Sequence, residues 1–136
     1  MERSELMNGI WDGDIDRHPE KSYTYIAPCG YKCEIKRNNF WAYCGFVYLP
    51  DDHPYYESSY DMLPHINVHG GLMFGYNGKF GFDCAQNDDV VPGTVTYRAK
   101  YPKIFKMPSE GQKYWTYEDT VKETNHMAQQ FYDLRK

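Results

Sequence analysis

The chain has 136 residues and a formal net charge of −4, a length that supports one domain with a real core. The acidic balance argues against binding to duplex nucleic acid, which needs a basic surface to displace counterions. No apolar run reaches the roughly eighteen residues that a membrane span requires. Because the first residues also lack the apolar core of a signal peptide, we expect a cytoplasmic protein with reduced thiols and no membrane partner.

The first half of the chain predicts an irregular segment followed by strands. Residues 1–22 are polar and glycine-interrupted, and 23–27 (Tyr-Thr-Tyr-Ile-Ala) has the composition of a strand. Segments 31–37 and 40–49 predict a hairpin around an Asn-Asn pair, since asparagine tolerates left-handed backbone.

The cysteines of this hairpin admit three interpretations. If the turn is Asn38-Asn39, Cys33 lies across from Cys44. The pair is then two buried thiols, a strained disulfide, or half of a zinc site completed by Cys29 and a distant Cys84 or histidine. Buried thiols are the simplest interpretation in a reducing compartment, and neither a metal nor a cofactor is expected.

The segment 50–64 is expected to be an acidic, tyrosine-rich loop between two prolines. Loops held on a rigid sheet often carry binding residues. We therefore count His53, Tyr55 and Tyr56 as candidate ligand-binding residues.

Residues 65–86 predict one long β-hairpin. Asn77-Gly78 is typical of a two-residue turn, which places Tyr76 opposite Lys79 and Phe74 opposite Gly81. Side chains alternate between the two faces of a strand. One face then carries a polar row, and the other an apolar row. The polar row consists of His65, Asn67, His69, Cys84 and Gln86.

The polar row is the best candidate for a chemical site. Cys84 lies diagonal to His69, and a cysteine beside a histidine can form a thiolate nucleophile. His65, Asn67 and Gln86 would orient the base or donate hydrogen bonds to a ligand. The same row would serve either catalysis by Cys84 and His69 or the binding of a ligand. A metal is disfavoured, because histidines four residues apart on a strand are about 13 Å apart.

Two adjacent glycines admit a second register for this hairpin. Gly70-Gly71 in a strand is typical of a bulge or of a backbone that closely approaches a ligand. A bulge would shift the pairing by one residue and bring Asp83 to the polar face.

The remaining residues predict a basic segment and a helix. Thr94 to Ala99 could form a further strand, and a positive patch follows, typical either of a protected sheet edge or of anion binding. The patch comprises Arg98, Lys100, Lys103, Lys106 and Lys113.

Thr116 and Asp119 predict a capping box that begins a helix with an apolar stripe over one face of the sheet. The expected fold is α+β: a mostly antiparallel sheet of β-hairpins with a C-terminal helix packed on one face, in a single domain over 1–136.

Two motifs carry a resemblance. Val68-His69-Gly70-Gly71-Leu72 followed by Gly81-Phe82-Asp83-Cys84-Ala85 resembles a group of small proteins of tailed bacteriophages and some large viruses. The resemblance covers roughly residues 30–134 and implies the setting of an infected host cell rather than a mechanism. Members of the group tend to carry His and then Gly-Asp after the Asp-Cys-Ala motif. Gln86 and Asn87-Asp88 stand there in this chain, which weakens the case for catalysis.

Three hypotheses for function follow. The first is a phage-type accessory protein that holds a small anionic ligand such as a cyclic nucleotide used as a host-defence signal, with rings stacking on the base and basic side chains meeting phosphate. The second is a Cys/His enzyme acting on such a ligand. The third is an inhibitor of a host protein that binds through the loop around Tyr55, Tyr56 and Tyr60. Exposed hairpin edges would also allow a homodimer.

Overall fold

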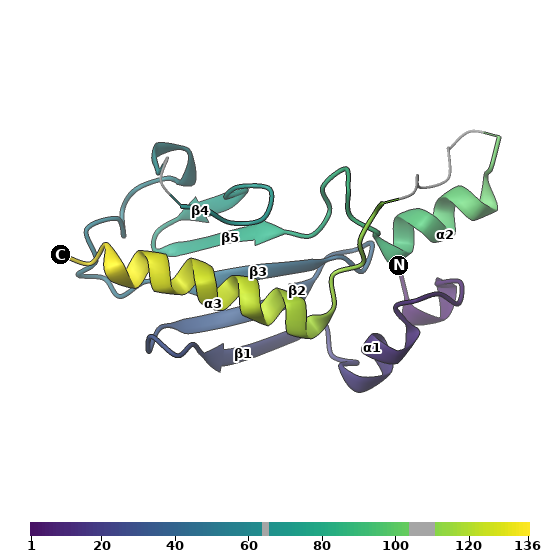
Figure 1. Cartoon of the computed structure of the whole chain (residues 1–136), viewed down its shortest axis with the longest axis horizontal. Helices are drawn as coiled ribbons and strands as arrows, with labels where there is room; N and C mark the ends of the chain where they lie inside the picture. Colours follow the sequence, from purple (N-terminus) through teal and green to yellow (C-terminus); the bar gives the residue numbers. More distant parts are fainter. Residues whose placement is uncertain (64–65, 104–110) are drawn as a thin grey trace.

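The computed structural model describes residues 1–63, 66–103 and 111–136. Its centre is one antiparallel sheet in the order β1-β2-β3-β5-β4, crossed on one face by helix α3 (Figure 1). This arrangement confirms the predicted α+β class. The strands are β1 (Ser22–Ile26), β2 (Lys32–Arg37), β3 (Tyr43–Tyr48), β4 (Phe74–Tyr76) and β5 (Lys79–Asp83).

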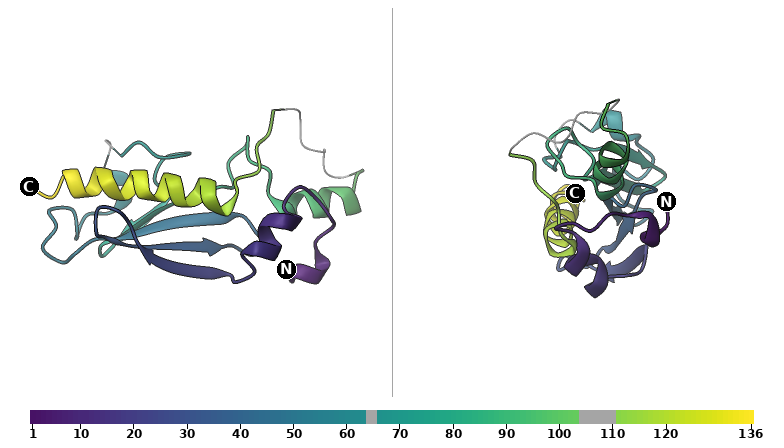
Figure 2. Two further views of the ribbon diagram at one scale, coloured as in Figure 1. Left: turned by 60° about the horizontal axis from the view of Figure 1, so that its bottom comes forward. Right: turned by 90° about the vertical axis from the view of Figure 1, so that its right-hand side faces the viewer.

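The helices η1, α1 and α2 lie at one end of the sheet, η2 lies beside β4, and α3 runs along the sheet (Figures 1 and 2). The segment expected to be irregular contains the short helix α1. The elements are η1 (Arg3–Glu5), α1 (Asp12–Arg17), η2 (Tyr60–Met62), α2 (Pro92–Lys100) and α3 (Tyr117–Asp133). None of the helices in the described ranges has both the length and the apolar character needed to cross a bilayer.

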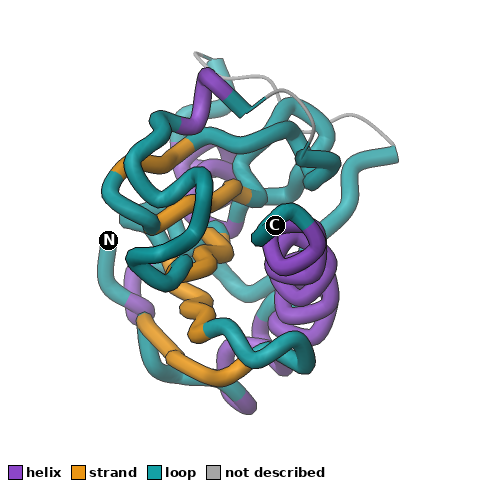
Figure 3. Tube along the Cα trace, turned by 90° about the vertical axis from the view of Figure 1, so that its left-hand side faces the viewer, coloured by secondary structure: helices purple, strands orange, loops and turns teal. Residues whose placement is uncertain are grey.

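Helix α3 begins where its capping signal predicts. The Thr116 hydroxyl accepts from the Asp119 N–H at 3.1 Å, and the Asp119 carboxylate accepts from the Thr116 N–H at 3.2 Å. The helix packs on the sheet through its apolar stripe, which includes the buried Ala128 and Phe131, and the Phe131 ring stacks on Phe80 at 5.1 Å between centroids. Among the residues that the structure describes, the opposite face of the sheet carries no helix comparable to α3 (Figure 3).

The β2–β3 hairpin corrects the predicted cysteine pairing. Lys36 pairs with Cys44, so Cys33 lies opposite Val47. The loop 38–42 is longer than an Asn-Asn turn because the Asn38 side chain accepts from the N–H groups of Phe40 and Ala42. Cys33 therefore faces α3 while Cys44 lies on the other side of the sheet, and all four cysteines are free thiols.

The central hairpin is correct at its turn and wrong away from it. Asn77 and Gly78 take φ of 52° and 82°, and the predicted pairs Tyr76–Lys79 and Phe74–Gly81 form. Strand β4 has only three residues, however, and Gly70 and Gly71 have φ of 69° and 78°. Since this backbone is left-handed, the chain leaves the sheet before β4, and the polar row does not exist as a strand face.

The segment predicted as a further strand, Thr94 to Ala99, is helical. It belongs to α2, which starts at Pro92, where a missing N–H costs nothing. The Gly93 N–H donates to the Phe40 carbonyl at 2.8 Å, and the two backbones are in close contact. This tertiary contact overrides the strand propensity of the Thr and Val residues.

Candidate functional site

The centre of the candidate site is a pair formed by an imidazole and a carboxylate. His69 Nε2 lies 2.7 Å and 3.0 Å from the two carboxylate oxygens of Asp89. Asp89 is buried, and it also accepts from the Gln86 N–H at 2.8 Å. Because a carboxylate only accepts, Nε2 carries the proton, and Nδ1 of a neutral His69 is an acceptor.

The backbone around Asp89 positions a tryptophan beside this pair. The Val90 N–H donates to the Lys113 carbonyl, and the Lys113 N–H donates to the Asp88 carbonyl, at 2.8 and 2.9 Å. The Trp115 ring then lies 4.3 Å from the His69 ring between centroids, tilted by 37°. The Lys113 ammonium lies 4.5 Å from the centre of the same indole. Trp115 therefore contacts both a basic ring and a cation.

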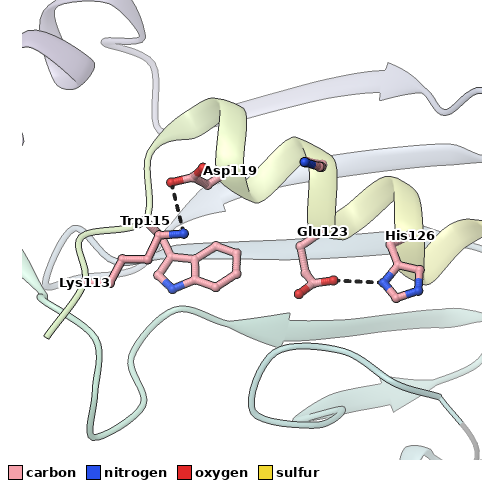
Figure 4. A pocket seen from close by; sticks show the side chains of 6 residues that line it. Lys113, Trp115, Asp119, Glu123 and His126 are labelled. Carbon is pink, nitrogen blue, oxygen red and sulfur yellow. Dashed lines mark hydrogen bonds and ion pairs between the residues drawn. The ribbon is translucent and has the colours of Figure 1, made fainter. Parts of the chain in front are cut away.

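Trp115 lines an open groove of about 300 Å³ along α3 (Figure 4). Lys113 pairs with Asp119 at 3.6 Å, and Glu123 pairs with His126 at 3.2 Å. The groove thus offers an aromatic surface, cations and carboxylates within one hollow. Its lining residues are Lys113, Trp115, Asp119, Lys122, Glu123 and His126.

A second hollow, of about 160 Å³, is lined in part by Asp89. The predicted residues Gln86 and Arg98 both line it. The Gln112 amide nitrogen donates to the Asn87 carbonyl at 2.8 Å, while its buried oxygen has no partner among the described residues. The Asp89 carboxylate both lines this small polar cavity and binds His69, so the cavity is adjacent to the His69–Asp89 pair.

Loops, rather than strand pairing, bring three of the predicted residues together: His69, Asp83 and Gln86. The Gln86 amide donates to Asp83 at 2.6 Å, and the Gln86 N–H reaches the carboxylate that holds His69. A Cβ at Gly70 would lie 2.6 Å from the Gln86 side chain, so this close approach requires glycine. His65 lies outside the described residues.

Cys84 has the environment of a core thiol. It is 2% exposed, and its sulfur lies 3.9 Å from the Thr120 hydroxyl. Burial raises the pKa of the Cys84 thiol, so it stays protonated at neutral pH. A nucleophile needs a thiolate that a substrate can reach, and this position offers neither.

The other predicted ligand residues lie elsewhere. His53 is buried; its Nδ1 accepts from the Tyr55 N–H at 3.0 Å, and its Nε2 donates to the Phe131 carbonyl at 2.7 Å. Both ring nitrogens therefore stabilise the loop against the C-terminal end of α3. The Asn67 backbone is held by the side chain of Gln130 through two hydrogen bonds of 2.7 Å.

Tyr56 and Lys100 also lie outside the groove. The Tyr56 ring packs over Gly78 at the β4–β5 turn. Lys100 is exposed at the end of α2, with its ammonium 5.7 Å from the centre of the Tyr101 ring.

Sequence reasoning missed Asp89 and Trp115, which complete the site. Asp89 belongs to a short acidic run with no recognisable motif, and Trp115 carries no motif either. The one signal available was the position of Asp89 just beyond the Asp83-Cys84-Ala85 motif.

A different cluster could in principle hold a metal. Ligand atoms of Asp14, His18 and Glu118 lie within 4.8 Å of one another. The Asp14 carboxylate, however, already accepts hydrogen bonds from Arg37, Tyr43, Tyr114 and the Tyr117 N–H. Its lone pairs are engaged, so this cluster is a structural network.

A comparison of the chain with protein-family models, with curated proteins and with solved structures found no match.

Proposed function

We propose that this protein binds a small phosphate-bearing molecule with an aromatic ring, of the nucleotide class, in the Trp115 groove. The observation that carries the proposal is the exposure of one indole, lysines and carboxylates in a single hollow of about 300 Å³. This volume is at the lower end of the range for small-molecule sites.

Each group of the groove matches a part of such a ligand. The Trp115 indole offers a stacking surface for a base once the Lys113 ammonium, 4.5 Å from the ring centre, turns toward a phosphate. Such a contact is worth about 1–3 kcal/mol. Lys113 and Lys122 are the partners for phosphate oxygens. Asp119 and Glu123 would accept from the exocyclic amino and ring N–H groups of a purine, which explains why carboxylates line a site for an anion.

The His69–Asp89 pair positions the stacking surface. Asp89 fixes the His69 ring by two short contacts, and that ring lies against Trp115. His69 is therefore a positioning residue for binding, and its Nδ1 remains an acceptor for a ligand group near the indole.

The test is a thermal-shift and calorimetry screen with nucleoside mono- and diphosphates and cyclic nucleotides. A ligand at about one hundred times its Kd stabilises the protein by about 2.7 kcal/mol. Lys122→Glu is expected to weaken binding at least tenfold, because it replaces a phosphate partner by a like charge. Lys136→Glu is the matched control, since Lys136 is an exposed lysine outside the groove. No stabilisation by any nucleotide, or equal effects of both variants, would refute the proposal.

A second candidate function is proton transfer by His69, favoured by its bond to the buried Asp89 carboxylate. In this version the protein converts the bound ligand instead of only holding it. His69→Gln should abolish product formation even at ligand concentrations that saturate the variant, with product measured by chromatography and saturation by calorimetry on the same samples. A wild-type protein that returns every ligand unchanged would remove this candidate.

The setting of the proposal rests on the resemblance to phage and large-virus proteins. It supports the cytoplasm of an infected cell as the location, and a nucleotide signal of host defence is a ligand that this setting would offer. Cyclic dinucleotides and cyclic mononucleotides therefore belong in the first screen.

A further inference from the structure

The face of the sheet that α3 leaves open carries a row of aromatic rings. On β2, and on β3 from Gly45 to Tyr48, the residues of this face alternate with the buried residues that face α3. Phe74 is 40% exposed and Tyr76 is 71% exposed. The Phe46 and Phe74 rings lie 5.6 Å apart between centroids, with an interplanar angle of 41°.

The backbone of the sheet makes room for this aromatic row. Gly81 lies on β5 between β3 and β4, opposite Phe46 on one side and Phe74 on the other. A Cβ at Gly81 would be 2.5 Å from the Phe46 ring, so the ring lies directly on the backbone of the glycine. A ring held in this way offers its outer surface to a ligand.

Lysines are interleaved with the rings. The Lys79 ammonium lies 4.5 Å from the centre of the Phe46 ring and 5.1 Å from that of Tyr48, and Glu34 holds it at 3.1 Å. The Lys32 ammonium lies 4.8 Å from the centre of the Tyr48 ring. With the exposed Lys36 these make three cations on a face that also carries Glu34 and Asp83. Among these residues the three lysines outnumber the two carboxylates, so the face lacks the net negative charge of the chain as a whole.

This face ends in a hollow of about 300 Å³ beside the 38–42 loop. Lys36 and Phe46 line it together with Asn38 and Asn39. Side-chain amides are the donors and acceptors that recognise the edges of bases. The Asn38 oxygen is already used within the loop, which leaves the Asn39 amide for such a contact.

We propose that this face binds single-stranded nucleic acid, with bases stacked on Phe46 and Phe74 and phosphates held by Lys32 and Lys36. The aromatic rings of the sheet can stack on the π-faces of bases in a single-stranded nucleic acid, and the lysines between the rings can bind its anionic backbone. A duplex hides those faces and demands far more positive charge. The surface is distinct from the Trp115 groove, because it lies on the side of the sheet opposite α3.

The experiment is fluorescence anisotropy with labelled oligo(dT) and oligo(rU) about ten nucleotides long, a length that covers a typical site. Phe74→Ala should weaken binding about fivefold or more, since each stacked base contributes that much or more. Lys32→Glu/Lys36→Glu should weaken binding further and reduce its dependence on salt between about 50 and 200 mM. Lys100→Glu/Lys136→Glu, the same change in charge away from this face, should bind as the wild type does.

Three outcomes would overturn the proposal. The first is no saturable binding of single strands to the wild type. The second is an equal affinity for a duplex of the same length. The third is a dimer seen by sedimentation that Phe74→Ala dissociates while no oligonucleotide binds, because the face would then be an interface between two copies. Loss of mononucleotide binding in the Trp115 groove would leave this proposal intact, since the two surfaces are tested by different variants.

Discussion

The reactivity of the cysteines is decided by burial. Desolvation raises the pKa of Cys33 and of Cys44 to about 12, and it raises that of Cys84 as well. Cys29 is half-buried beside the core. Native protein treated with iodoacetamide at about pH 8 should therefore gain one adduct, at Cys29, by intact mass and peptide mapping.

Two controls make this result specific. Cys29→Ser should remove the adduct, and denatured protein should be labelled at all four cysteines. If Cys84 reacted in the native state as fast as Cys29, its thiol would be accessible. The hypothesis of a Cys84 nucleophile would then regain its basis.

The ionisation of Glu34 makes the stability of the fold depend on pH. Burial alone would raise its pKa, but hydrogen bonds from Ser22, Lys79 and Tyr48 hold the pKa of this carboxyl below its usual range. Because the pKa is lower in the folded state, Glu34 stabilises the fold above its unfolded pKa of about 4.3, and the contribution is lost as the pH falls through the folded pKa.

The corresponding measurement is urea unfolding from neutral pH to below about pH 4. Glu34→Gln should make the free energy of unfolding less dependent on pH in this acidic window, by about 1 kcal/mol or less because Lys79 is 39% exposed. If the free energy of unfolding of the variant depended on pH as strongly as that of the wild type, Glu34 would not be the source of this dependence.

Among the elements, the approach of α3 to β3 depends on one glycine. A Cβ at Gly45 would collide with the Thr124 hydroxyl on α3 and with the Phe82 ring on β5. Gly45→Ala should therefore reduce the free energy of unfolding by about 1–3 kcal/mol, the usual cost of overpacking. Urea denaturation followed by circular dichroism measures the change.

Gly13→Ala is the matched control for this substitution. Its Cβ would meet only the flexible end of Arg17 at 3.3 Å, and Gly13 lies within α1, where alanine is the better helix former. We expect no loss of stability. Equal losses at both positions would contradict the packing argument.

The elements with local signals were those that could be predicted from the sequence. The Asn77-Gly78 turn and the Thr116 cap depend on residues within a few positions of each other. The 38–42 loop and α2 could not be predicted, because side-chain capping by Asn38 and a distant contact of Gly93 with Phe40 decide them.

The candidate site was predictable in part for the same reason. The motifs Val68–Leu72 and Gly81–Ala85 contain or adjoin three residues of the site, His69, Asp83 and Gln86. The turn between the two motifs brings them close together whether or not they pair as strands. Their partners Asp89 and Trp115 are placed by a short bridge between residues far apart in the chain, and such non-local pairing leaves no periodic signal in the sequence.

At the scale of the whole molecule, the buried Asp14 carboxylate joins the N-terminal segment to the sheet and to α3. It accepts from Arg37 on β2 at 3.2 Å, from Tyr43 on β3 at 2.9 Å, and from Tyr114 at 2.5 Å. It also accepts from the Tyr117 N–H at the start of α3 at 3.1 Å. Burial raises the pKa of both tyrosines, so their hydroxyls remain donors.

Asp14→Ala should reduce the free energy of unfolding by about 3–5 kcal/mol, because it leaves the Arg37 guanidinium buried without its counter-ion. The acceptors that remain for Arg37 are uncharged, the Trp41 carbonyl and the hydroxyls of Tyr43 and Tyr114, and its Nε lacks a partner within the described residues. Asp16→Ala, two residues away and 74% exposed, should cost less than about 1 kcal/mol. Asp14→Ala/Arg37→Met should be more stable than Asp14→Ala alone, since the second change removes the orphaned charge. A single Asp14 variant as stable as the wild type in urea would show that this network does not hold the segments together.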